Sequence, residues 1–134
     1  MRTNLVALGL AAALAASQAW AHHAFAAEFD LNKPLTLRGK VTRMEWINPH
    51  AWIHMEVAGA DGVTHEWMIE CGAPNGLLRR GFTKESLTKG TEIVVTGWQA
   101  KDDSYRANGS DITLPDGKKL FLGSSNPDAD GASK

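Results

Sequence analysis

The feature that most limits the possible folds is a long alternating segment that changes phase in its middle. In LTLRGKVTRMEW (35–46), Leu37 and Val41 lie on one side of an extended strand, whereas Met44 and Trp46 continue the apolar pattern on the other. Successive side chains of a strand point to opposite faces, so a change of phase requires a bulge or a bend. The glycine between the two halves is typical of such a place. This pattern predicts one bent strand that serves two parts of a sheet.

The segments that follow predict three more strands, one short helical insertion and a closing hairpin. Residues 51–57 and 63–71 alternate with apolar residues at odd positions, and the turn sequence GADG joins them. Residues 77–87 are the only helical candidate. Residues 91–98 have the composition of a buried strand, and 112–122 have the pattern of a closing hairpin.

This order of elements predicts a mainly β protein with an OB-fold-like architecture, a small five-stranded Greek-key barrel that is partly open. The short helix falls between strands three and four, and a C-terminal hairpin closes the chain. A small β-sandwich of similar strand count is the alternative, and the helical insertion favours the barrel. We expect an N-terminal arm at 22–34, the barrel domain at 35–123 and a disordered polar tail at 124–134.

Residues 1–21 have the pattern of a secretory signal peptide. Arg2 supplies the positive start, and a short apolar run and small residues follow it. The run is shorter than the roughly 20 residues that a membrane span needs, so no span is expected after signal removal. Cleavage fits after Ala21 or after Ala19, and the first is preferred because it keeps Trp20 away from the new N-terminus. The sequence therefore predicts an exported protein.

Charge and cysteine content exclude two classes of protein. The formal net charge is −1 at pH 7, and signal removal takes away one positive residue. Nucleic-acid binding requires a basic face, so no nucleic-acid partner is expected. Cys71 is the only cysteine, so no internal disulfide can form and stability must come from the hydrophobic core.

Four motifs also resemble the pattern of a domain-of-unknown-function family of small exported proteobacterial proteins. They are HHAFAAEFD (22–30), MEWINPHAWI (44–53), PNGLLRRG (74–81) and LPDGKKLF (114–121). The resemblance extends over the mature chain to Gly123. It implies a periplasmic location and brings no activity with it.

The five histidines all follow the predicted signal peptide. His50 and His54 share the outer face of the second predicted strand, but four extended residues separate them by about 13 Å. Ligands of one transition metal lie only about 2.0–2.1 Å from it, so these two histidines are not expected to form a metal pair. His65 falls on the core-facing side of the next strand, away from His54, and is expected to be structural.

The N-terminal histidines suggest a different metal site. If cleavage follows Ala21, His22 offers both its imidazole and the free α-amine of the chain, which form a chelate from one residue. A third nitrogen from His50, or as second choice His54, would complete a histidine brace, an arrangement that suits Cu(II). His23 is expected to be either a fourth ligand or a group that contacts the ligands without binding the metal. Zinc is the second choice of metal. The amine must lose a proton to bind, so metal binding should weaken in acid.

A periplasmic adaptor is the alternative function. Trp52, Arg79 and Arg80 are the candidate contacts to a partner protein or small ligand. Glu66 and Glu70 fall on the outer face of the third strand and are expected to be solvated or paired across strands. No motif in the sequence indicates a nucleophile or a general acid–base pair. The sequence therefore favours a non-catalytic role over an oxidative copper enzyme.

Overall fold

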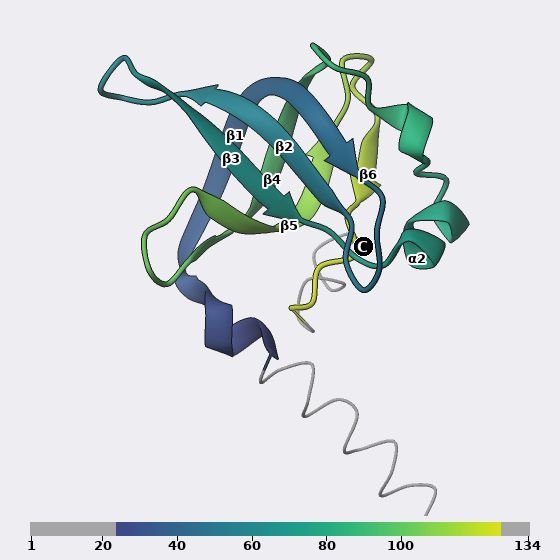
Figure 1. The fold of residues 1–134 in the computed structure, drawn as a ribbon, viewed down its shortest axis with the longest axis horizontal. Helices are drawn as coiled ribbons and strands as arrows, with labels where there is room; N and C mark the ends of the chain where they lie inside the picture. The colour runs from purple at the N-terminus through teal and green to yellow at the C-terminus, as the bar shows by residue number, and fades with distance from the viewer. Residues whose placement is uncertain (1–23, 127–134) are drawn as a thin grey trace, which may run out of the picture.

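The computed structural model describes residues 24–126, which form one six-stranded sheet in the order β3-β2-β1-β4-β5-β6 (Figure 1). The predicted signal peptide, His22, His23 and residues 127–134 lie outside the described residues. The elements are β1 (Phe29–Glu45), β2 (Trp52–Ala58), β3 (Thr64–Glu70), α2 (Pro74–Arg79), the 3-10 helix η1 (Lys84–Ser86), β4 (Glu92–Ala100), β5 (Arg106–Thr113) and β6 (Lys119–Phe121).

The sheet curls into a ring because its third and fifth strands also pair. β3 and β5 are parallel and align Met68 with Arg106, Ile69 with Ala107 and Glu70 with Asn108. The neighbouring pairs β1–β2, β2–β3, β1–β4 and β4–β5 are antiparallel. Following these contacts gives the circular order β1-β2-β3-β5-β4, which is that of the OB-fold. The predicted OB-fold-like barrel is confirmed, including the helical insertion before β4 and the closing β5–β6 hairpin.

The bent first strand is also confirmed. β1 pairs with β4 up to Lys40, pairs with β2 from Lys40 onward, and shifts register between Val41 and Arg43. A Cβ on Gly39 would lie 2.1 Å from the carbonyl oxygen of Glu56, so only glycine allows β1 and β2 to approach so closely at the bend. β1 begins at Phe29, earlier than the strand expected from residue 35, because the chain continues to pair with β4.

The barrel interior holds the predicted apolar side chains of the alternating strands. Ala51, Ile53, Met55 and Val57 of the second strand region are buried, as expected from strand parity. Val63 differs: it was expected to face the core, but it is exposed because it lies in the turn before β3. The buried members of the main core are Leu37, Val41, Ala51, Ile53, Met55, Val57, Trp67, Ile69, Cys71, Leu77, Phe82, Leu87, Ile93, Val95, Ala107, Ile112 and Leu122.

The helical insertion closes one end of the barrel. α2 begins at Pro74, earlier than the helix expected from residue 77, and proline suits the first turn because its missing N–H would have no helical partner. Thr83 caps η1, and its backbone N–H donates to the Ser86 hydroxyl at 2.8 Å. Phe82 lies between the two helices and stacks on Trp46 with ring centroids 6.3 Å apart.

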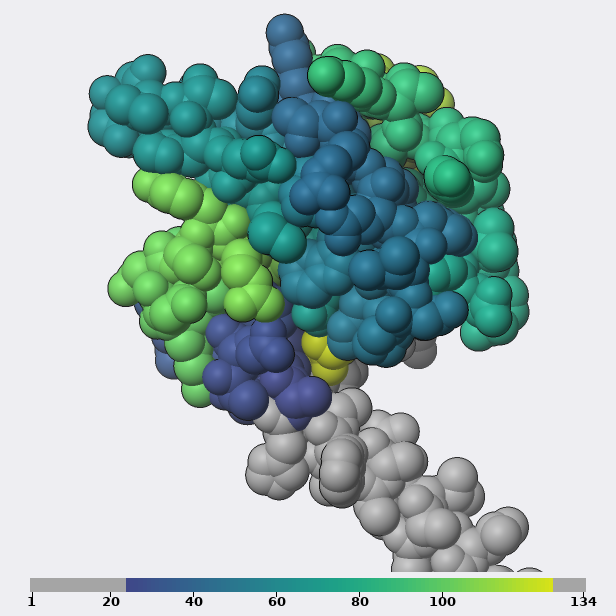
Figure 2. Space-filling view, in the orientation of Figure 1, coloured from purple at the N-terminus to yellow at the C-terminus, as the bar shows by residue number. Residues whose placement is uncertain are grey.

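The N-terminal arm packs against the barrel through a second, smaller cluster. Residues 24–28 are helical and lead into β1. Phe25 and Phe29 are buried with Ala100 and contact Trp98, whose ring meets that of Phe25 edge-on at 5.7 Å. Figure 2 shows the purple atoms of the arm against the green atoms of the β4–β5 loop and the yellow atoms near the C-terminal end of the described chain.

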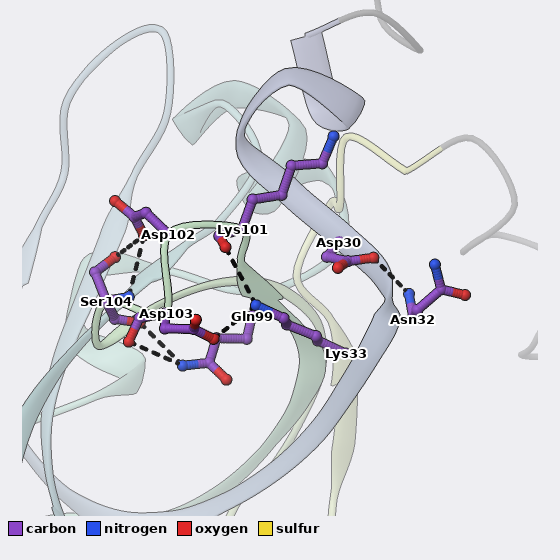
Figure 3. A network of polar contacts seen from close by, with 8 residues as sticks. All are labelled: Asp30, Asn32, Lys33, Gln99, Lys101, Asp102, Asp103 and Ser104. Carbon is purple, nitrogen blue, oxygen red and sulfur yellow. Dashed lines mark hydrogen bonds and ion pairs between the residues drawn. The ribbon is translucent and has the colours of Figure 1, made fainter.

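Polar contacts between β1 and the β4–β5 loop hold the base of the arm (Figure 3). The Lys33 ammonium lies 2.6 Å from the Asp103 carboxylate and donates to the Lys101 carbonyl at 3.2 Å. The Gln99 amide donates to the Ser104 carbonyl at 3.2 Å. These contacts fix the loop to which the arm helix is bound, since the Lys101 backbone N–H donates to the Glu28 carbonyl at 2.9 Å. Within residues 24–126, no helix is long and apolar enough to cross a membrane.

Candidate functional site

The candidate site lies at the end of the barrel where the β1–β2 loop meets the ends of β3 and β5. His50 follows the cis Asn48–Pro49 peptide bond in this loop, and its side chain is 39% exposed. Its Nδ1 lies 3.6 Å from Oε2 of Glu70, the last residue of β3. Trp52, at the start of β2, stands opposite Glu70 in the strand register. An exposed imidazole is therefore paired with a carboxylate that belongs to the rigid sheet.

Glu70 is buried and not solvated, and it is paired across strands, which is the other alternative that the sequence left open. Asn108 donates a hydrogen bond from Nδ2 to Oε1 of Glu70 at 3.1 Å, and the parallel β3–β5 pairing brings these two residues together. Burial raises the pKa of the Glu70 carboxyl above its usual value, and the Glu28 carboxylate raises it further. The nearby charges of His50 and Arg106 and the Asn108 hydrogen bond act in the opposite direction. The alternation of residues along single strands could not predict this pair, because Glu70 and Asn108 meet only where β3 pairs with β5.

The segment after β6 completes the surroundings of Asn108. Its Nδ2 donates to the Ser125 hydroxyl at 3.0 Å, and its Oδ1 accepts a hydrogen bond from the Ser124 hydroxyl. The Asn126 backbone N–H donates to the Ser124 hydroxyl at 3.0 Å, and Asn126 is buried. Residues 124–126 thus pack on the barrel, although the sequence predicted disorder from residue 124, because Asn108 gives their polar groups partners.

Arg106 connects the N-terminal arm to the same end of the barrel. Its guanidinium lies 2.9 Å from the Glu28 carboxylate and 5.6 Å from the centre of the Trp52 ring. Glu28 is also near enough to Glu70 to raise its pKa. The arm, which residues 22 and 23 precede, is therefore anchored beside the carboxylate that contacts His50.

His54 occupies a different environment, although it shares a strand with Trp52. It is 2% exposed, with Nδ1 3.2 Å from a Glu66 oxygen and Nε2 3.2 Å from a Glu45 oxygen. The Arg43 guanidinium lies 3.3 Å from Nδ1. The expected outer-face position is correct, but side chains from β1 and β3 cover the ring. Only Nδ1 of His54 makes a hydrogen bond to a carboxylate, because the buried Nε2 lies near Glu45 without hydrogen-bond geometry, and no contact joins His54 to His50.

The remaining candidate residues are partly engaged in contacts within the protein. Arg80 stacks over the Phe121 ring at 4.3 Å, whereas Arg79 is exposed at the end of α2. His65 stacks on Tyr105 at 4.2 Å, and its Nε2 lies 3.2 Å from Asp61, in agreement with the expected structural role. Cys71 is buried, and this burial raises the pKa of its thiol, so it is not suited to be a nucleophile.

Comparison with known proteins identifies the family. A family model matches residues 10–109, which is most of the chain. The chain belongs to a family of unknown function (DUF6152). The matched range includes His50, Glu70 and Asn108 and ends within β5, so it ends earlier in the chain than the resemblance, which was expected to reach Gly123. No curated protein matches the chain.

Metal binding cannot be assigned to the described residues alone. Between residues 24 and 126, no three His, Cys, Asp or Glu side chains are grouped so that they could hold a metal ion. His50 with Glu70 supplies one imidazole and one carboxylate, so a metal at this end of the barrel would need further ligands. His22 and His23, the first candidates, lie outside the described residues.

The raised pKa of Glu70 predicts a pH-dependent effect on stability. The folded pKa lies above the unfolded value of about 4.5, so Glu70 favours folding most in acid. This contribution is lost as the pH rises from the unfolded value through the folded one. Glu70→Gln has no such proton to lose, so it should gain stability relative to the wild type as the pH rises above about 4.5. Urea unfolding of both proteins measures this difference, and a difference that stays constant with pH would contradict the prediction.

Proposed function

We propose that the protein is a periplasmic, non-catalytic metal-binding module that binds Cu(II) at its N-terminus. Cleavage after Ala21 would make His22 the first residue, so that its α-amine and imidazole bind the metal together. His50 supplies the third nitrogen, and His23 assists. Amine and imidazole nitrogens in a tetragonal arrangement favour copper among the divalent metals, and zinc is the second choice.

The observation that carries the proposal is the position of His50 relative to the arm. The Glu28 side chain at the end of the arm helix reaches Arg106 at 2.9 Å and influences Glu70, which in turn contacts His50. Residues 22 and 23 directly precede this arm, which is fixed to the barrel through Glu28. Two extended residues span at most about 7 Å, so His22 cannot be far from the start of the arm. An anchored arm reduces the entropy lost when a terminal residue and a loop residue bind one metal.

The same geometry favours His50 over His54 as the third ligand. The His50 side chain is 39% exposed, so a metal can approach its ring. His54 is 2% exposed and has a carboxylate near each ring nitrogen, so binding a metal there would require displacing Glu45 or Glu66. We therefore assign His54 a structural role and do not include it among the metal ligands.

The test begins with the N-terminus of the exported protein. Mass spectrometry is expected to find His22 as the first residue, and calorimetric titration of that protein with Cu(II) is expected to show one site tighter than about micromolar. His22→Ala and His50→Ala should each weaken binding by more than the roughly 10–100-fold that outer-shell substitutions cause. Affinity should also fall as the pH drops below about 7.7, where the α-amine is protonated.

His65→Ala is the matched control, because His65 is a histidine of the same barrel that contacts Asp61 and Tyr105 instead. It should leave copper affinity unchanged. A mature N-terminus at Trp20, or binding no tighter than micromolar, would overturn the proposal. Peroxide turnover by the copper-loaded protein with added reductant would contradict the non-catalytic role.

A further inference from the structure

We infer that Glu70 is a positioning residue that holds His50 in the tautomer protonated at Nδ1, so that Nε2 is the nitrogen that binds the metal. The metal part of this inference rests on the proposed copper site. The tautomer part concerns the metal-free protein and can be tested without copper. In the sequence, Glu70 was expected only to be solvated or paired across strands, with no role toward His50.

The chemistry of the contact between Glu70 and His50 favours this tautomer. Oε2 of Glu70 lies 3.6 Å from Nδ1 of His50, and the other carboxylate oxygen accepts the hydrogen bond from Asn108. An ionised carboxylate only accepts hydrogen bonds, so the ring nitrogen that faces it is favoured as the N–H. The other nitrogen, Nε2, then carries the lone pair that a metal needs. Carboxylates that orient metal-binding histidines in this way also increase the basicity of the ring.

Glu70 and His50 differ in burial and in the kind of element to which they belong. Glu70 is buried at the end of β3, and Asn108 holds its Oε1 at 3.1 Å. His50 is in a loop with its side chain 39% exposed, so its ring can turn toward the fixed carboxylate and shorten the 3.6 Å contact to a hydrogen bond. The position of the Glu70 carboxylate is therefore fixed by the sheet, and the His50 ring orients toward it.

Asn108 is itself held in one orientation by its hydrogen bonds. Its Oδ1 accepts a hydrogen bond from Ser124, and its Nδ2 donates to both Glu70 and Ser125. The Glu70 carboxylate distinguishes the two ends of the amide, because an ionised carboxylate only accepts hydrogen bonds and the amide nitrogen is the end that donates. A chain of polar contacts thus runs from the segment after β6 through Asn108 and Glu70 to His50.

Glu70→Gln is the decisive variant because it keeps the shape of the side chain. Asn108 would still donate to Oε1, which places the new amide nitrogen where Oε2 faces His50. This nitrogen donates a hydrogen bond, so Nδ1 of His50 must accept it and the proton moves to Nε2. Nitrogen-15 NMR of the metal-free protein at about pH 8, where unperturbed histidine is neutral, reports which nitrogen is protonated.

Glu66→Gln is the matched control. Glu66 lies on the same strand, and its carboxylate contacts His54, not His50. We expect the wild type and Glu66→Gln to show His50 protonated at Nδ1, and Glu70→Gln to show it protonated at Nε2. A wild-type His50 protonated at Nε2, or no change in Glu70→Gln, would overturn the inference.

Copper titration of the same three proteins separates the inference from the proposed function. Glu70→Gln should bind Cu(II) about 10–100-fold more weakly than the wild type, and Glu66→Gln should bind equally well. Equal affinity of Glu70→Gln and the wild type would overturn the role of Glu70 in metal binding and leave the copper site intact. A wild type that binds no copper but shows the tautomer change would overturn the proposed function and support the positioning of His50.

Discussion

Gly97→Ala is expected to destabilise the barrel strongly, although a change from glycine to alanine often stabilises a protein by restricting the unfolded chain. Gly97 lies in β4 between Leu35 of β1 and Gly109 of β5. A Cβ on Gly97 would lie 2.0 Å from the Asn108 carbonyl oxygen and 3.1 Å from the Gly109 Cα. Both contacts are backbone, so only a separation of β4 from β5 can relieve them. We expect a loss of about 3 kcal/mol, the upper end of the usual cost of overpacking, or more.

Gly76→Ala is the matched control for this prediction. Gly76 lies in α2, and a Cβ there would meet nothing within 4 Å. Alanine should therefore leave stability unchanged or increase it by up to about 1 kcal/mol. Urea unfolding of the two variants and the wild type gives both free energies. If the two variants were equally stable, the close approach of β4 and β5 at Gly97 would be contradicted.

Leu77→Ala is expected to lower the free energy of unfolding by about 2–5 kcal/mol, the usual cost of removing a buried leucine side chain. Leu77 is 1% exposed and belongs to the main core, where α2 covers the end of the barrel. Its neighbour Leu78 is 48% exposed. Substitution to alanine leaves a cavity at position 77 but only removes surface area at position 78.

Leu78→Ala controls for every effect except burial, because it makes the same chemical change in the same helix. We expect it to change stability by no more than about 0.5 kcal/mol. The comparison is made by urea unfolding under identical conditions, with circular dichroism to check that the strand content is retained. Similar losses in both variants would mean that α2 does not bury Leu77 against the barrel.

Much of the fold follows from local patterns in the sequence. The phase change in the first strand predicted the bulge between Val41 and Arg43, because a strand has a period of two residues and cannot otherwise change its buried face. The odd-numbered apolar residues of the second strand are buried for the same reason. Strand order followed from the position of the helical insertion, since few small folds place one helix between the third and fourth strands.

The candidate site was predicted only in part. His50 was expected on the outer face of the second strand, but β2 begins only at Trp52, so His50 lies in the preceding loop, where its Nδ1 is 3.6 Å from Glu70. Parity also placed His54 on the outer face, but it could not predict burial by Glu45 and Glu66, which depends on side chains from β1 and β3. Glu70 was placed on the outer face of its strand, but its burial and its contact with His50 were missed, and its position on that face was the available signal.

The sequence by itself determined which face of each strand is apolar, where the first strand bends and which residue types are available for chemistry. These properties depend on neighbouring residues and on the two-residue period of a strand. Only the tertiary structure decided that Glu70 is buried and held by Asn108, 38 positions away in the chain. That contact depends on the parallel pairing of β3 with β5, which forms only when the sheet closes on itself. The closure of the sheet therefore buries Glu70 beside Asn108, where its carboxylate lies near His50.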